Sequence, residues 1–232
     1  MSHHESKKSV LAVNRIELLS FYDDPTPTEK GMTATAVNSV AGEEFGLALL
    51  MRYFDDAGIA ATVLPGTCTT GKKKGPRLDA WVETPDILYQ VEIKNWSAHS
   101  FEGTHFPLTA SEDQAVAHRR KIWYEYWTGE TFTDAPAAKV LEPMKPPHDR
   151  KPVEPLIAFW EALHPEGSAI SFFSVGVPSS QYFSRVHVFS MSTYLRSMQS
   201  EDLNLPMPKT RARLDVLDRI FRHLADDTSA KG

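Results

Sequence analysis

The stretch RLDAWVETPDILYQVEIKNW, residues 77–96, contains two apolar runs on either side of a Thr-Pro-Asp turn. This arrangement predicts a β-hairpin, in which side chains alternate between the two faces of each strand. In the second run, one face is apolar and carries Tyr89, Val91 and Ile93. The other face becomes polar toward the end of the strand and carries Leu88, Gln90, Glu92 and Lys94. We expect the sheet to open into a cleft where this strand ends.

The first run predicts the same alternation, with Leu78, Ala80 and Val82 on one face and Asp79 and Trp81 on the other. Pairing through the turn at residues 84–86 would bring Asp79 close to Glu92 and Lys94. Two carboxylates can hold a hard divalent cation through oxygen, as Mg²⁺ prefers. A lysine beside them can orient an attacking water and stabilise the charge that develops on a phosphate.

The alternative interpretation of these three residues is a surface ion pair, which would contribute only about 0–1 kcal/mol to stability. Glu-x-Lys spacing alone is not specific, because Glu5-Ser6-Lys7 in the polar N-terminal segment has it as well. The position of Glu92 and Lys94 inside an otherwise apolar strand is what favours a functional site.

The segment NSVAGEEFGLALLMRYFDDAG predicts a helix with an apolar stripe at helical spacing. Asn38 or Ser39 can cap its start, and Gly58 can end it in the left-handed conformation. Glu43 and Glu44 lie at the two edges of the stripe. Because acids in the first turn also suit the helix dipole, a structural role for this pair stays open beside a functional one.

The rest of the chain predicts further elements around the hairpin. Strands are expected at residues 59–66, 169–177 and 185–191, helices at 111–127 and 210–224, and an element of either type at 155–163. Six prolines from Pro136 to Pro155 indicate an irregular insertion at about residues 136–155. We expect a tail with a peripheral element over residues 1–35 and one domain over 36–232, built on a mixed sheet flanked by helices.

Charge and composition limit the function classes. The chain has 25 Lys and Arg against 30 Asp and Glu, a net charge of −5. A protein that only coats nucleic acid is usually basic, whereas a nuclease can be acidic if its basic groups lie on one side. The single cysteine, Cys68, excludes an internal disulfide. With no apolar run that could span a membrane and no signal-peptide core, we expect a cytoplasmic protein.

The chain resembles the PD-(D/E)xK superfamily, the restriction-endonuclease-like nucleases. The resemblance lies in the order of three features: an acid on a helix, an acid on a strand, and Glu-x-Lys on the next strand. The matching positions are Glu44 (or Glu43), Asp79 and Glu92-Ile93-Lys94. The literal Pro85-Asp86 is not the match, because Asp86 is only six residues before Glu92 and falls in the expected turn.

The resemblance implies an α/β fold with an αβα core around a mixed sheet of four to five strands. It also implies hydrolysis of DNA phosphodiester bonds with Mg²⁺ or Mn²⁺. Asp79, Glu92, the backbone carbonyl of Ile93 and Glu44 would hold the metal, and Lys94 would position the attacking water.

Residues that could contact the substrate lie on the same strand, in the preceding loop and on the following helix: Gln90, Lys72, Lys73, Lys74, Gln114 and Arg119. Gln114 and His118 partly match a Gln-x-x-x-Tyr motif of RecB-type nucleases. Trp96 and Trp123 could stack bases, although core packing is the commoner role. Short basic runs are also commonly solvated surface.

The expected partner is nucleic acid, DNA rather than RNA, and a homodimer or a partner protein is compatible with the pattern. The main competing function is a catalytically inactive module of the same fold that binds nucleic acid or a protein. A serine or cysteine hydrolase finds little support, because the chain lacks a Gly-x-Ser-x-Gly motif and Cys68 has no histidine near it in the sequence.

Overall fold

The structure is a computed structural model that describes residues 10–23, 30–65, 68–72, 75–94, 112–128, 136–178 and 180–207. Its elements in chain order are β1 (Val10–Asn14), α1 (Arg15–Asp23), α2 (Lys30–Asp56), β2 (Thr62–Leu64), β3 (Cys68–Thr69), β4 (Arg77–Leu78), β5 (Ala80–Glu83), β6 (Leu88–Lys94), α3 (Glu112–Thr128), the 3₁₀ helix η2 (Pro136–Leu141), β7 (Val153–Phe159), β8 (Phe172–Gly176), β9 (Arg185–Ser190), α5 (Met191–Ser197) and β10 (Asp202–Pro206).

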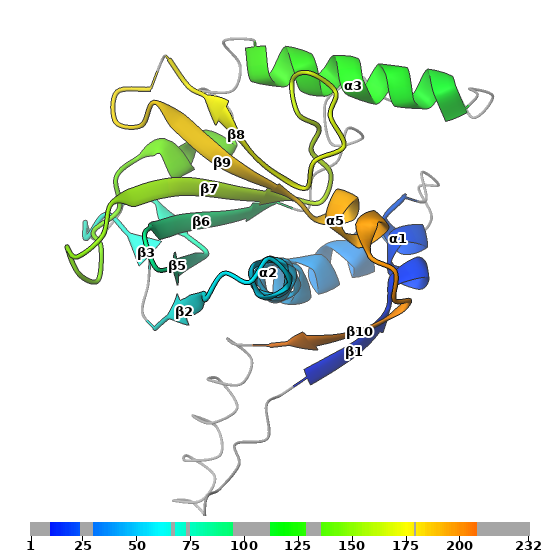
Figure 1. The fold of residues 1–232 in the computed structure, drawn as a ribbon, viewed down its shortest axis with the longest axis horizontal. Coiled ribbons are helices and arrows are strands. Elements are labelled where there is room, and N and C mark those ends of the chain that lie inside the picture. The colour runs from blue at the N-terminus through cyan, green and yellow to red at the C-terminus, as the bar shows by residue number, and fades with distance from the viewer. Residues whose placement is uncertain are drawn as a thin grey trace, which may run out of the picture.

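The central sheet has six strands in the order β2-β5-β6-β7-β9-β8 (Figure 1). β6 is parallel to β7 and β7 to β9, while the other neighbouring strands are antiparallel. The mixed α/β architecture predicted from the sequence is confirmed, but the predicted number of four to five strands is too low. The segment of either type at residues 155–163 falls largely in β7. This strand lies between β6 and β9 and is buried on both faces, so it lacks the alternation that identifies a strand.

Helices cover both faces of the sheet. Helix α2 packs on the face that carries Tyr89, Val91 and Ile93, and α5 joins the same core cluster. Helix α3 and η2 cover the opposite face, which carries Leu88. Figure 1 shows α3 and α2 on opposite sides of the strands. Six of the seven residues of β6 are therefore buried, including Gln90 and Glu92, and the last residue, Lys94, is partly exposed.

The hairpin forms as predicted at its turn but not along the whole of its first strand. Thr84 and Ile87 close the turn, with the Thr84 N–H donated to the Ile87 carbonyl at 2.9 Å, and Asp86 is exposed. The single strand expected over residues 77–83 is wrong, because the strand breaks at Asp79. Leu78 consequently packs in the cluster under α3, whereas Ala80 packs under α2.

Helix α2 is longer than its capping signals predicted, since it begins at Lys30 rather than near Asn38. Its end is as predicted: Gly58 has φ of +69°. The N–H groups of Gly58 and Ile59 are donated to the carbonyls of Asp55 and Phe54, which is the Schellman pattern.

The N- and C-terminal parts of the described chain meet. β1 pairs with β10 in an antiparallel two-stranded sheet, and the Arg15 N–H is donated to the Glu201 carbonyl at 2.7 Å. β10 also packs against α2. Residue 36, where the domain was expected to begin, lies within α2. The helix expected at residues 210–224 lies outside the described residues. None of the described helices is long and apolar enough to cross a membrane.

Candidate active site

The break between β4 and β5 aims Asp79 at the end of β6. Ala80 is paired with Val91, and the Asp79 N–H is donated to the Val91 carbonyl at 2.9 Å. The side chain continues in the same direction, because Asp79 Oδ2 accepts the Ile93 N–H at 2.7 Å. Asp79 therefore occupies the position that a regular strand partner would take, with its carboxylate bound to the β6 backbone.

Glu92 and Lys94 lie two positions apart on one face of β6, as the alternation predicted. Lys94 Nζ is 2.6 Å from Glu92 Oε1, and Glu92 is only 1% exposed. A second ammonium, Lys139 Nζ, lies 2.7 Å from the same oxygen. The other oxygen, Glu92 Oε2, is buried and accepts no hydrogen bond from the described residues.

Opposing effects act on the pKa of Glu92. Burial raises the pKa of Glu92 above its ordinary value, and the nearby Asp79 carboxylate raises it further. Hydrogen bonds from Lys139 and Lys94 lower the pKa without fully offsetting these two effects. A buried acid whose charge is disfavoured by a neighbouring carboxylate, and which has one buried oxygen without a hydrogen bond from the described residues, is an environment that an added cation would stabilise.

The expected fourth member of the site, Glu44, lies on another element. It is buried on α2, and its neighbour Glu43 is partly exposed. Helix α2 contacts the side of β6 that carries Ile93, where a Cβ on Gly46 would lie 2.7 Å from Ile93 Cγ2. The side chain of Glu92 points to the opposite side. Within the described residues, no three His, Cys, Asp or Glu side chains are grouped so that they could hold one metal ion.

Gln90, expected as a substrate contact, is fully buried and used within the protein. Its side-chain amide is donated to the carbonyls of Val140 and Glu142, the latter at 2.8 Å. Its oxygen accepts the Met144 N–H at 3.1 Å. Both amide hydrogens are thus engaged, and Gln90 fixes the segment that follows η2 against the sheet.

The other expected substrate contacts are spread over two places. Lys72 is exposed in the loop after β3, and Lys73 and Lys74 lie outside the described residues. On α3, Gln114 and His118 are exposed. Arg119, on the same helix, lies 3.6 Å from the buried carboxylate of Glu161.

The tryptophans expected as stacking candidates do not both fall within the described chain. Trp123 is fully buried in the cluster between α3 and the sheet, which supports its packing role. Trp96 lies outside the described residues.

Sequence reasoning missed two charged residues near the end of β6. Lys139 comes from η2, in the proline-rich segment, where no periodic pattern predicts its position. Glu161 follows β7, whose end is paired with Lys94, and continues its alternation toward α3. The logic applied to Glu92, an acid at the end of a buried strand, could have identified Glu161.

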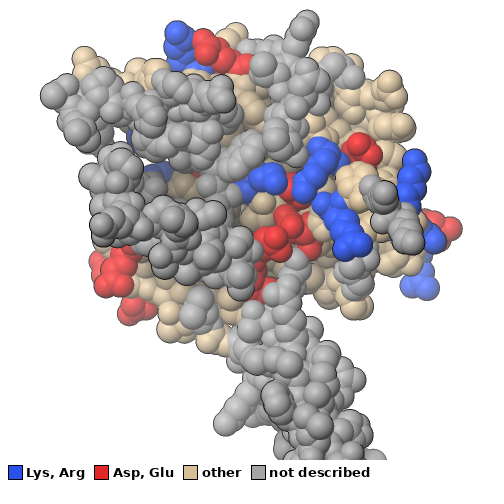
Figure 2. All heavy atoms as spheres, turned by 180° about the vertical axis from the view of Figure 1, so that it is seen from behind, with Lys and Arg blue, Asp and Glu red and all other residues tan. Residues whose placement is uncertain are grey.

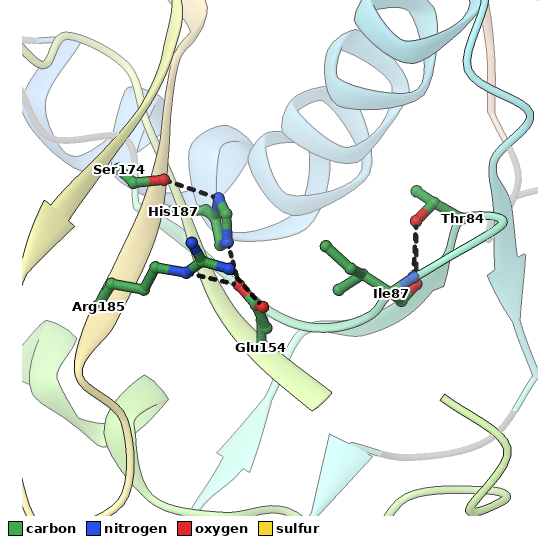
Figure 3. Close-up of polar contacts among 6 residues, drawn as sticks. All are labelled: Thr84, Ile87, Glu154, Ser174, Arg185 and His187. Atoms are coloured by element: carbon green, nitrogen blue, oxygen red, sulfur yellow. Dashed lines mark hydrogen bonds and ion pairs between the residues drawn. The ribbon is translucent and has the colours of Figure 1, made fainter. Parts of the chain in front are cut away.

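A separate polar cluster joins β7, β8 and β9 at the far end of the sheet (Figure 3). Ser174 Oγ lies 3.1 Å from His187 Nδ1, the other ring nitrogen contacts Glu154, and Arg185 is bonded to Glu154 at 2.7 and 3.1 Å. Ser174 and His187 face each other because they are register partners. The cluster lies near the start of β7, whereas Glu92 and Lys94 are paired with its end. It therefore belongs to a different region from the Glu92 site.

A cleft of about 560 Å³ also lies away from Glu92. Its lining includes Arg52 and Asp55 at the end of α2, together with Glu83 and Lys151 beside the hairpin turn. Figure 2 shows the molecule from behind, with acidic and basic side chains side by side on that face. Charged groups are thus distributed over the described surface, whereas the Glu92 cluster places a buried acid, a second carboxylate and two lysines at the end of a strand.

Comparison of the chain with protein-family models, with curated proteins and with solved structures finds no match. The functional argument therefore rests on the residues and on their geometry.

Proposed function

We propose that the protein is a metal-dependent nuclease that hydrolyses phosphodiester bonds, in DNA rather than RNA. The observation that carries the proposal is the meeting of Asp79, Glu92 and Lys94 at the end of β6, with Glu92 Oε2 buried and lacking a hydrogen-bond donor among the described residues. A buried polar atom without a partner costs free energy, so its retention calls for an explanation. A bound cation would supply one.

The residues fit a magnesium or manganese ion. Mg²⁺ is commonly bound by one or two carboxylates together with substrate phosphates and waters, and Asp79 and Glu92 provide two carboxylates. The carbonyl of Ile93 is the third candidate ligand. When bound, the cation would act as a Lewis acid on a phosphoryl oxygen.

Lys94 supplies the second part of the chemistry. Its ammonium is held by Glu92 at 2.6 Å and remains about one-fifth exposed, so it can face both the buried acid and a substrate. A fixed positive charge in a partly buried position stabilises negative charge on a phosphate better than a mobile surface lysine would. Lys94 therefore orients the attacking water and stabilises the developing charge, while the Ile93 N–H fixes the orientation of Asp79.

A second function, a non-catalytic module that binds nucleic acid or a partner protein, is favoured by one observation. The ammonium groups of Lys94 and Lys139 both contact Glu92 Oε1, so internal cations already neutralise this acid. In such a module the two lysines would replace the metal, and the cluster would be structural.

The two functions are separated by a cleavage assay on supercoiled plasmid, single-stranded DNA and RNA, with Mg²⁺, Mn²⁺ or EDTA. We expect metal-dependent cleavage of DNA by the wild type and a loss of at least about 100-fold in Lys94→Ala and Asp79→Asn. Arg150→Ala is the matched control, because this exposed arginine lies just before the start of β7, away from the site. Equal inertness of all variants on every substrate, with DNA binding retained, would favour the non-catalytic module.

A further inference from the structure

Glu92 has one more lysine than its neutralisation requires. Lys94 already lies at 2.6 Å from Glu92 Oε1, and Lys139 reaches the same atom from a different element. The Lys139 side chain is 35% exposed, so its ammonium lies at the boundary between the buried acid and solvent. A second cation at this boundary is suited to a ligand that approaches from outside.

The protein fixes the backbone that carries Lys139. Gln90 lies two residues before Glu92 on β6, and its buried amide is bonded to the carbonyls of Val140 and Glu142, one and three residues after Lys139. This connection couples the position of Lys139 to the strand that carries the site. A lysine that only solubilised a loop would not need a buried anchor.

A chain of contacts extends from Lys139 to further basic residues. Lys139 Nζ also donates to the Arg77 carbonyl at 3.2 Å, and Arg77 is the register partner of Thr69. The Thr69 carbonyl accepts the Lys145 N–H at 2.7 Å. The Lys145 stem packs over Gly71, where an added Cβ would lie 3.3 Å from its Cδ. Residues 68–72, 75–79 and 136–145 thus form one connected surface beside Glu92.

This surface is basic on an acidic protein. Its described residues include the cations Lys72, Arg77, Lys139 and Lys145, against the acids Asp79 and Glu142. The whole chain carries a net charge of −5. No ion pair within the described residues engages Arg77 or Lys145, and both are exposed. Local positive charge beside a carboxylate site complements a polyanion whose backbone passes the site.

We propose that Lys139, Arg77 and Lys145 form a track for the phosphate backbone of the nucleic acid, with Lys139 as its innermost phosphate-binding residue. The proposal rests on the proposed nuclease function, since it places the substrate of that site. It assigns a role to the proline-rich segment: residues 136–145 position one side of the track. Lys94 serves the reacting phosphate, and the track holds the neighbouring phosphates.

The test is the salt dependence of DNA binding, measured in EDTA by fluorescence anisotropy with a labelled duplex oligonucleotide. Each phosphate contact contributes about 0.9 to the slope of log Kobs against log salt. We expect Lys139→Gln and Lys145→Ala each to reduce the slope by about 0.9 and to weaken binding roughly eightfold at about 0.1 M salt. Lys139→Arg should restore the wild-type slope, and Arg150→Ala should leave it unchanged.

The binding and cleavage results together distinguish failure of the proposed phosphate track from failure of the proposed nuclease function. If the wild type cleaves DNA but Lys139→Gln and Lys145→Ala bind with the wild-type slope, the track is excluded and the nuclease stands. If both variants lose slope while the wild type does not cleave with Mg²⁺ or Mn²⁺, the track is supported and the nuclease fails. Thermal unfolding verifies that each variant is folded, and Lys145→Ala, an exposed change, keeps the test valid if Lys139→Gln is unstable.

Discussion

Gln90 and Glu92 lie two positions apart on one face of β6, and both are buried, but their polar atoms are used differently. The Gln90 amide is bonded on both its nitrogen and its oxygen, within the protein. Glu92 leaves one buried carboxylate oxygen without a donor among the described residues. Buried polar groups are normally satisfied, so the first pattern indicates a structural role, and the second is the one that the proposed cation would explain.

The structural role of Gln90 is tested by Gln90→Leu, which keeps a similar volume and removes the hydrogen bonds. We expect the free energy of unfolding to fall by about 2–4 kcal/mol, because buried backbone groups of Val140 and Met144 lose their partners. Chemical denaturation measures this change. Gln199→Leu, an exposed glutamine, should stay within about 0.5 kcal/mol of the wild type. A loss of similar size in both variants would contradict the assigned role of Gln90.

At the residue scale, local rules predicted the contacts that depend on one hairpin. The period of two places Glu92 beside Lys94, and the turn brings Asp79 to them, so no distant part of the chain is needed. The position of Glu44 relative to these residues depends on how α2 rotates and packs, which its own pattern does not determine. The position of Lys139 depends on the course of an irregular segment, which is held by contacts with distant residues, including the hydrogen bonds to Gln90 and the Thr69–Lys145 backbone bond.

At the scale of elements, β7 shows why one strand was not identified from the sequence. It lies between β6 and β9 with helices over both faces, so its apolar residues form a continuous run rather than an alternation. Its first residues are less buried and carry Glu154, which contacts Arg185 and His187 of β9. This contact ties the start of β7 to β9.

The contact of Glu154 with Arg185 and His187 makes the stability of the β7–β9 pairing depend on pH. Burial alone would raise the pKa of Glu154, but hydrogen bonds from Arg185 and His187, together with the electrostatic attraction of these residues, outweigh burial and lower the pKa below its ordinary value. The Glu154 carboxylate therefore binds fewer protons in the folded state than in the unfolded state. Its contribution to stability is fully present above about pH 4.5 and is lost as the pH falls through the lower pKa of the folded state. In Glu154→Gln this contribution is absent at every pH.

We therefore expect the melting temperature of the wild type to exceed that of Glu154→Gln at pH 7, and the gap to narrow as pH falls below about 4.5. Calorimetry of both proteins from neutral to acid pH measures the gap. Glu166→Gln, at an exposed glutamate, is the control and should follow the wild type. A constant gap for Glu154→Gln across the range would show that the carboxylate charge does not contribute.

At the scale of the whole molecule, the packing of both sheet faces explains how the carboxylate of Glu92 can be buried beside the half-buried Asp79 at the end of β6. The α2 core and the α3 core supply the apolar volume that holds the sheet, and Glu92 lies on the α3 side between Gln90 and Lys94. Folding therefore brings together acids that burial and mutual repulsion disfavour, as the raised pKa of Glu92 shows. A cation that binds there should return stability to the entire fold, because the site exists only in the folded chain.

This linkage gives a test that does not depend on catalysis. A cation present at about ten times its Kd, and bound only by the folded state, stabilises by about 1.4 kcal/mol, or roughly 3–6 °C in Tm for a chain of this size. We expect Mg²⁺ or Mn²⁺ to raise the Tm of the wild type by this amount relative to EDTA. Asp79→Asn and Glu92→Gln should lose the increase, whereas Lys145→Ala should keep it, because Lys145 lies on the proposed track and not among the ligands. An equal increase in Glu92→Gln would mean that the ion binds elsewhere, and the cation would then no longer account for the unsatisfied oxygen of Glu92.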